Sequence, residues 1–250
     1  MGVLSIERVQ FEAALNDLLA LYYGMGGAGN GQIPISRLRI INVVKAKIDE
    51  LIPEGEGVQF SLHSPPNVSN PYDLFISAVL DEATKNTIMM APVHLLEPTI
   101  YIPTAIKTLE DDWGETGYIE LPENFLRFIL FKMAEWERPA SEVISISSPL
   151  YLKQKNKFSR GFISKPVVAF SWFGTEESKK RILEYFSVPV GSEHAVEMFQ
   201  YMPETKAEDL QSNLIDVLTW VCASKVLQIT GQLDLSGNAM EQAVLCLNNL

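Results

Sequence analysis

The sequence predicts an α+β fold in which N-terminal and C-terminal helices form a helical bundle and bracket an inserted antiparallel β-sheet or small sandwich. Two observations support this expectation. Near both ends of the chain, apolar residues recur at the helical period of about 3.6 residues. The middle of the chain is instead rich in β-branched and aromatic residues, with turn residues between the runs. We therefore assign residues 1–98 together with 205–250 to a helical domain, and residues 99–204 to an antiparallel β domain.

Three helices are predicted before the β region. Residues 6–23 and 36–52 have amphipathic patterns, and Ser36 and Pro53 are placed to begin and end the second of these helices. A third helical pattern covers residues 71–90, after a turn-rich segment that contains several prolines. These helices form the N-terminal part of the predicted bundle.

The stretch GMGGAGNG, Gly24–Gly31, matches the dinucleotide-binding pattern G-x-G-x-x-G, and Asp49 follows about 20 residues later. In that pattern the glycines leave a β-strand, so that the N-terminus of the next helix faces the pyrophosphate. Here the glycines follow a predicted helix, and Asp49 lies within the next one. We interpret the stretch as a long loop, and we expect neither a nucleotide nor any other cofactor.

The β region contains segments with the composition of strands, separated by turn residues. The segment FGTEESKK, Phe173–Lys180, has the composition of a hairpin loop and favours antiparallel pairing of the strands on either side. We expect about five strands in an antiparallel sheet or small sandwich. The segments are residues 118–146, 165–173, 181–188 and 196–202.

Two helices are predicted at the C-terminus. The first runs from about residue 207 to Thr230-Gly231, because glycine suits the position that follows a helix. The second covers about residues 236–249. Cys222 and Cys246 fall in these two patterns, which favours two small buried apolar side chains over a disulfide framework. This usage is typical of a protein that folds in a reducing cytoplasm.

Charge and hydropathy exclude some classes of partner. A net charge of −11 makes a protein that wraps or reads duplex DNA improbable, because such proteins are basic. No apolar run reaches the roughly 20 residues of a membrane helix, so we expect no membrane partner. The histidines, His63, His94 and His194, stand apart from one another and from other ligands at metal-binding spacing, so we expect no metal site.

One acidic cluster keeps an enzymatic alternative open. Residues 110–113, EDDW, bring three carboxylates together as a hard-metal site requires, but a lone cluster beside Gly114 favours a solvated turn. The chain has no G-x-S-x-G, H-E-x-x-H, Walker A or C-x-x-C motif, so we expect no catalytic residue. The alternative is a small-molecule enzyme whose site is assembled from scattered residues around Asp111, Asp112 and His94.

A basic segment stands out in this acidic chain. The thirteen residues 153–165, KQKNKFSRGFISK, contain five bases and no acid, and two phenylalanines lie between the bases. Such a segment is a solvated loop, a contact for an acidic partner surface, or a contact for nucleic acid. We take it as the candidate subunit or partner interface, and its residues are Lys153, Lys155, Lys157, Phe158, Arg160, Phe162 and Lys165.

Three longer stretches resemble a known protein family. They are YIELPENFLRFILFKMAEWERP at 118–139, SPLYLKQKNKFSRGFISKPVVAF at 148–170, and LIDVLTWVCASKVLQITGQLDLSGNAMEQAVLCLNN at 214–249. Their order of features is an L-P-x-x-F-L strand, a W-x-R-P strand end, a basic turn, a K-P-V strand and a helix that ends in T-G-Q. This order resembles the head-to-tail connector proteins, also called adaptor or ring proteins, of short-tailed, crAss-like bacteriophages.

The resemblance covers about residues 118–250 and implies a structural virion protein rather than an enzyme. In that family about a dozen copies form a ring, a dodecamer, below the portal protein. The ring extends the DNA channel and docks the next tail component, and genomic DNA passes through the lumen without specific binding. The resemblance thus implies a place at the head-tail junction of the virion, with assembly in the host cytoplasm. Gly24–Gly31 and the proline-rich residues 64–71 depart from the family pattern.

Overall fold

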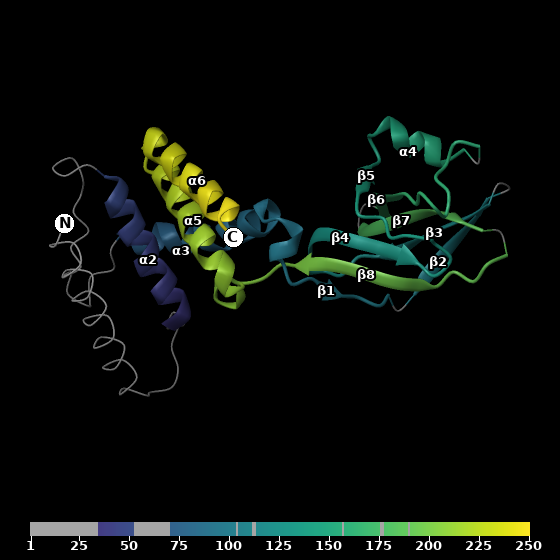
Figure 1. Ribbon diagram of the computed structural model, residues 1–250, viewed down its shortest axis with the longest axis horizontal. Helices are drawn as coiled ribbons and strands as arrows, with labels where there is room; N and C mark the ends of the chain where they lie inside the picture. Colours follow the sequence, from purple (N-terminus) through teal and green to yellow (C-terminus); the bar gives the residue numbers. More distant parts are fainter. Residues whose placement is uncertain are drawn as a thin grey trace. The chain divides into compact units, whose positions relative to one another are not determined.

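The computed structural model describes residues 35–52, 71–103, 105–111, 114–156, 158–175, 178–189 and 191–250 (Figure 1). Within these ranges the chain forms five α-helices and two β-sheets, and helices before and after the strands flank the sheet region. The predicted α+β class is therefore confirmed. The helix expected at 6–23 and the glycine stretch Gly24–Gly31 lie outside the described residues, and Asp49 lies within a helix, as expected.

Four of the five α-helices in the described residues share one hydrophobic core. They are α2 (Ile35–Leu51), α3 (Pro71–Met90), α5 (Ile215–Ile229) and α6 (Leu233–Asn248). Ser36 lies inside the first turn of α2 rather than at its N-cap. The core takes fully buried apolar side chains from each of these four helices, and α6 packs along α5 (Figure 1). Members of this core are Ile41, Val44, Ile48, Ile76, Leu80, Val217, Val221, Ala239 and Ala243.

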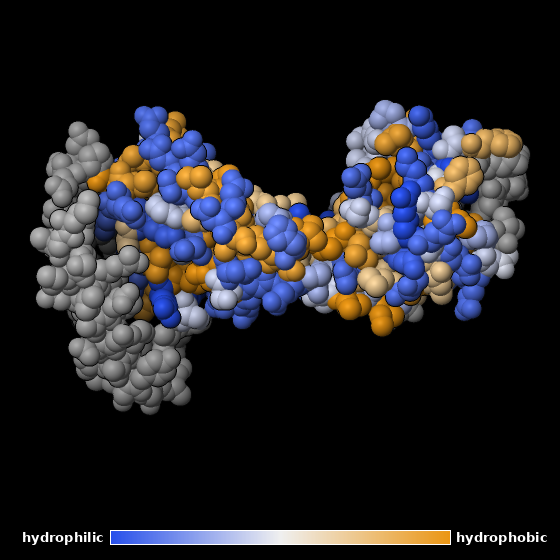
Figure 2. All heavy atoms as spheres, viewed as in Figure 1, coloured by the Kyte–Doolittle hydropathy of each residue, from blue (hydrophilic) through white to orange (hydrophobic). Residues whose placement is uncertain are grey.

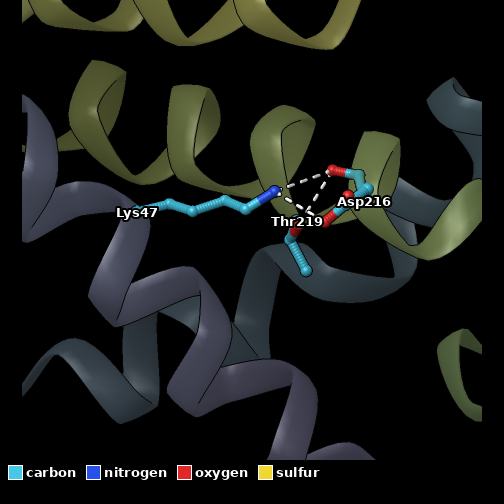
Figure 3. Close-up of polar contacts among 3 residues, drawn as sticks. All are labelled: Lys47, Asp216 and Thr219. Carbon is cyan, nitrogen blue, oxygen red and sulfur yellow. Dashed lines mark hydrogen bonds and ion pairs between the residues drawn. The ribbon is translucent and has the colours of Figure 1, made fainter. Parts of the chain in front are cut away.

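The lysine of α2 that contacts α5 shows how a charge is accommodated at the edge of this core. Lys47 Nζ lies 3.0 Å from Asp216 Oδ1 and donates to the Asp216 carbonyl oxygen at 3.3 Å (Figure 3). Thr219 Oγ1 donates to the same carbonyl at 2.8 Å. The ammonium group also lies 4.5 Å from the centre of the Trp220 ring. The aromatic face and the oxygens together compensate the loss of water around a mostly buried lysine.

The helix predicted to start at residue 207 begins later. Two 3₁₀ turns, Ala207–Asp209 and Ser212–Leu214, precede α5. Ala207, Leu210 and Leu214 are buried in the helical core at spacings of three and four residues, which is why the sequence pattern imitates a continuous helix.

The end of α5 agrees with the prediction. Gly231 has a φ of +82°, and its N–H donates to the Gln228 carbonyl at 3.2 Å. The N–H of Gln232 donates to the Leu227 carbonyl at 2.9 Å. This pair of hydrogen bonds is the Schellman motif, which satisfies carbonyls that the helix leaves without a partner. In the two C-terminal helices Cys222 is buried and Cys246 half-buried, and neither forms a disulfide bond.

The β region differs from the prediction in strand number and in one pairing. A three-stranded sheet has the order β1 (Thr99–Ile100), β8 (Val196–Pro203), β4 (Phe125–Met133). A five-stranded sheet has the order β2 (Ile106–Asp111), β3 (Gly114–Glu120), β7 (Lys180–Val188), β6 (Val168–Phe173), β5 (Val143–Ser145). The expectation of about five antiparallel strands was wrong, because the described residues form eight strands. Of these, β1 and β2 lie outside the expected segments, β1 and β5 are very short, and β5 pairs parallel with β6. The chain between β5 and β6 is long enough for the crossover that a parallel pair requires.

The two sheets pack on a second core that is rich in aromatic side chains. Phe131 of β4 lies 6.1 Å from the Tyr185 ring of β7 and 5.8 Å from the Phe199 ring of β8. Trp136 is also buried there, and its indole N–H donates to the Ser187 carbonyl at 3.2 Å. The β6–β7 hairpin forms as predicted, with its turn in the predicted loop segment.

Strand β4 contributes to both cores. Leu126 and Ile129 pack with the helices, whereas Phe128 and Phe131 pack between the sheets. Register shifts along the β4–β8 pair change the faces that successive side chains occupy, which allows one strand to serve two cores. The predicted division into residues 1–98 with 205–250 and residues 99–204 stays a prediction.

We expect Gly231→Ala and Gly237→Ala to change the free energy of unfolding in opposite directions. A Cβ atom would meet no neighbouring atom at either position. The positive φ of Gly231 makes alanine cost about 1–2 kcal/mol there. Gly237 lies in the interior of α6, where alanine should stabilise the helix by about 0.5–1 kcal/mol. Urea denaturation of each variant measures both changes, and equal signs would contradict this account.

Candidate functional site

The candidate basic segment begins in a helix that the sequence analysis missed. Helix α4 covers Pro149–Gln154, and Ser148 is its N-cap, with the hydroxyl accepting a hydrogen bond from the Leu150 N–H at 3.2 Å. Serine followed by proline is a recognised start of a helix, so this signal was present in the sequence. Lys153 therefore lies in the last turn of a helix, not in a turn or loop.

The chain after α4 has a defined course. The buried side chain of Gln154 accepts a hydrogen bond from the Gly161 N–H at 2.9 Å and donates to the Leu150 carbonyl at 3.3 Å. The Ser187 hydroxyl donates to the Gly161 carbonyl. A Cβ atom at Gly161 would lie 2.6 Å from the Lys165 carbonyl, so the backbone needs a glycine there. The segment is thus fixed by its own hydrogen bonds and joined to β7 through Ser187, rather than free in solvent.

Lys155 forms an ion pair with an acid on strand β7. Its Nζ atom lies 3.1 Å from Glu184 Oε2 on β7, and the Tyr151 hydroxyl donates to the same carboxylate at 2.9 Å. The Glu184 side chain is only 10% exposed. The ammonium also lies 4.9 Å from the centre of the Tyr151 ring and 5.6 Å from that of Phe186. Because its charge is compensated here, Lys155 anchors α4 to the sheet.

The surroundings of the cluster formed by Tyr151, Lys155 and Glu184 determine its protonation. Burial lowers the pKa of Lys155, but its contact with Tyr151 and the charge of Glu184 outweigh that effect, so its pKa is raised. Burial is the main cause that raises the pKa of the Tyr151 hydroxyl, and Glu184 adds to it. The folded state therefore favours a protonated lysine and a protonated tyrosine.

The remaining residues of the segment divide between surface and interior. Phe158 is 82% exposed and Phe162 is 68% exposed, and Lys153 and Lys165 are also exposed. Arg160 is buried, so it contributes no surface to an interface, and Lys157 lies outside the described residues. Lys153 and Lys165 form no ion pair with any described residue.

Further exposed apolar side chains lie on α4 and just before it. Leu152 is 72% exposed, Leu150 is 50% exposed and Ile146 is 48% exposed. Figure 2 shows hydrophobic groups next to strongly hydrophilic ones over α4 and the chain that follows it. The sequence signal for the larger surface is a run without any acid, from Val143 to Thr175. We define the α4 face as Ile146, Leu150, Leu152, Lys153, Phe158, Phe162 and Lys165.

Those of the other candidate residues that the structure describes lie on separate elements. His94 is exposed on the 3₁₀ turn Val93–Leu95, and Asp111 ends β2 where the strand meets β3. Asp112 and His63 lie outside the described residues. His194 has a structural contact, because its Nδ1 atom shares a hydrogen bond with the Tyr185 hydroxyl.

The described ranges contain no group of three or more His, Cys, Asp or Glu residues that could hold a metal ion. Nor does any helix within those ranges have the length and apolar character needed to cross a bilayer. No known family model matches the chain, and no curated protein sequence matches it either. The α4 face is thus the surface from which a function can be argued.

We expect Lys155→Met to reduce the free energy of unfolding by about 1 kcal/mol, because it leaves the Glu184 carboxylate without its cation. Lys153→Met is the matched control, since Lys153 is an exposed lysine of the same segment with no ion pair among the described residues. That control should change the free energy by less than about 0.5 kcal/mol. Equal effects of the two substitutions in urea denaturation would show that the Lys155 contact contributes nothing.

We also expect the stability of the fold to decrease at alkaline pH in a way that depends on this cluster. A group whose pKa is raised on folding contributes stability below its unfolded pKa, and this contribution is lost as the pH rises through the folded value. For Tyr151 and Lys155 the loss begins near pH 10. Urea denaturation should be measured from about pH 8 to about pH 11, a range that brackets the ordinary pKa values of tyrosine and lysine. The free energy of unfolding should decline less steeply with pH in the Tyr151→Phe/Lys155→Met double variant than in the parent. Parallel curves would contradict the assignment.

Proposed function

We propose that the chain is a structural subunit of a head-to-tail connector ring in a short-tailed bacteriophage, and not an enzyme. About a dozen copies would form a ring below the portal protein, dock the next tail component and extend the channel for DNA. The protein would then act at the head-tail junction of the virion after assembly in the host cytoplasm. The observation that carries the proposal is the α4 face, together with the resemblance of residues 118–250 to that family.

The α4 face has the composition of a protein-binding surface. Large apolar side chains that stand out from a structured segment are typical of contact sites, since the hydrophobic effect favours their burial. Phe158, Phe162 and Leu152 are each more than two-thirds exposed. Aromatic side chains supply much of the affinity of interfaces, and cations at the rim supply specificity and association rate. The arrangement suits a subunit that assembles.

An acidic partner surface fits the α4 face better than the other two alternatives. A solvated loop would need neither the hydrogen bond from the Gly161 N–H to the buried Gln154 side chain, which fixes the segment internally, nor the Ser187 hydrogen bond, which joins it to the sheet. Nucleic-acid binding would call for several available cations, but Lys155 is paired with Glu184 and Arg160 is buried. A protein with net charge −11 offers acidic surface to its neighbours, while it repels DNA phosphates that pass through a channel.

The enzymatic alternative gains no support from a specific observation. It depends on Asp111, Asp112 and His94, and the described residues provide no contact that joins them. The proposal of a structural subunit therefore takes precedence.

Mixing the purified chain with the portal protein of its phage should produce closed rings of about a dozen copies, because a portal provides a symmetric template. Negative-stain images and native mass spectrometry measure ring formation and copy number. Replacing Phe158 and Phe162 by Ser should weaken assembly at an unchanged melting temperature, whereas Lys206→Glu, at an exposed position that is not part of the α4 face, should not weaken assembly. A chain that remains monomeric alone and with its portal would refute the proposed function.

A further inference from the structure

A second surface of the chain combines exposed apolar side chains with acids. On α6, Leu233 is 66% exposed, Leu245 is 51% exposed and Val244 is 43% exposed. At 100° per residue, these positions and Glu241 fall within an arc of about 120° on the side of α6 opposite the buried Ala239 and Ala243. We define the α6 face as Leu233, Asp234, Gly237, Glu241, Val244 and Leu245.

Gly237, in the middle of the α6 face, is a second and independent indication that this face is a contact surface. Gly237 lies in the interior of α6, where glycine weakens a helix relative to alanine. A Cβ atom there would meet no atom within 4 Å, and no positive φ requires a glycine. Nothing within the described residues thus explains a glycine at this position. A shallow gap on the outer side of a helix allows another chain to approach its backbone closely.

The two faces are complementary in charge. From Val226 to Leu250 the chain has two acids, Asp234 and Glu241, and no base, whereas the run from Val143 to Thr175 has bases and no acid. Neither acid of the α6 face forms an ion pair with a described residue, and the same holds for Lys153 and Lys165. The charges of each face thus have no oppositely charged partner among the described residues. The other face carries charges of that opposite sign.

We infer that the α6 face of one copy binds the α4 face of the next copy. Lys153 and Lys165 would lie opposite Glu241 and Asp234, and an exposed phenylalanine of the α4 face would pack over Gly237. This inference rests on the proposed connector function and specifies the contact by which its subunits assemble. Because two different surfaces of the chain meet, the contact is heterologous, and it propagates from copy to copy until a ring closes.

A second copy of the chain is the occupant that both faces favour. Each face leaves apolar side chains and charges exposed, and the same chain carries the complement of each. A foreign acidic partner would account for the bases of the α4 face, but it would leave the acids, the leucines and Gly237 of the α6 face without a role. The self-complementary pair accounts for both faces at once.

Two charge-reversed variants test the contact. Variant A is Lys153→Glu/Lys165→Glu, and variant B is Asp234→Lys/Glu241→Lys, so that each variant reverses both charges of one face. In a heterologous contact each variant alone brings like charges together. An equal mixture restores attraction at every contact, because A and B alternate around the ring. Lys206→Glu and Glu142→Lys are matched controls on exposed positions outside both faces.

Sedimentation of the purified full-length chain, alone and with its portal protein, measures association. Each variant alone should associate about tenfold more weakly than the parent, and the mixture should recover parental assembly. The two controls should assemble as the parent does. Gly237→Ala should weaken assembly even though it should stabilise the isolated chain, and this opposite pair of effects separates a contact from a folding defect.

Each remaining outcome decides against the inference. If the parent forms rings and variant B assembles equally well, the α6 face is not the partner of the α4 face, although the connector function stands. If both variants fail and the mixture fails too, the two faces do not meet one another. If the parent neither associates by itself nor on its portal, the connector function and the inference both fail.

Discussion

The contact between Arg127 and the end of α3 links the helical core to the sheet core. Arg127 Nη1 donates to the Ile88 carbonyl at 2.7 Å and to the Ala91 carbonyl at 2.6 Å. The last carbonyls of a helix have no partner within it, so a guanidinium placed there satisfies them and meets the negative end of the helix dipole. Burial lowers the pKa of this arginine, which nevertheless stays charged. Its neighbours Leu126 and Phe128 pack in different cores, so the strand that carries it is constrained on both faces.

The same principle, a polar group used to fix an element in place, produces the α4 face. Glu184 and Ser187 of β7 hold α4 and the chain after it against the five-stranded sheet, and Gln154 joins the end of α4 to Gly161. Ser187 does so with a φ of +76°, a conformation that is unfavourable for a residue with a side chain. Because the backbone of α4 and of the chain after it is held, their exposed leucines and phenylalanines have defined positions. A defined surface loses less conformational entropy on binding, which favours its use as an interface.

Predictions from local sequence patterns succeeded where contacts between residues close in the sequence determine the structure. The helices at 36–52 and 71–90, the glycine end of α5 and the hairpin between β6 and β7 all depend on neighbours within a few residues, and the structure contains each of them. The start of α5 was wrong because buried residues in 3₁₀ turns repeat at nearly the helical spacing. Helix α4 was missed because a strong local signal, Ser148-Pro149, lay inside a segment dominated by its charge.

The sequence by itself determined the α+β class, the position of the strand region between helices, and the presence of a basic segment in an acidic chain. Only the tertiary structure decided what that segment presents to a partner. Lys155 meets an acid 29 residues further along the chain, and no local pattern contains such a pairing. The parallel pairing of β5 with β6 and the division of β4 between two cores were also set by contacts between distant residues. Periodicity and composition report the surroundings of a residue along the chain, whereas burial and charge compensation depend on what folding brings beside it.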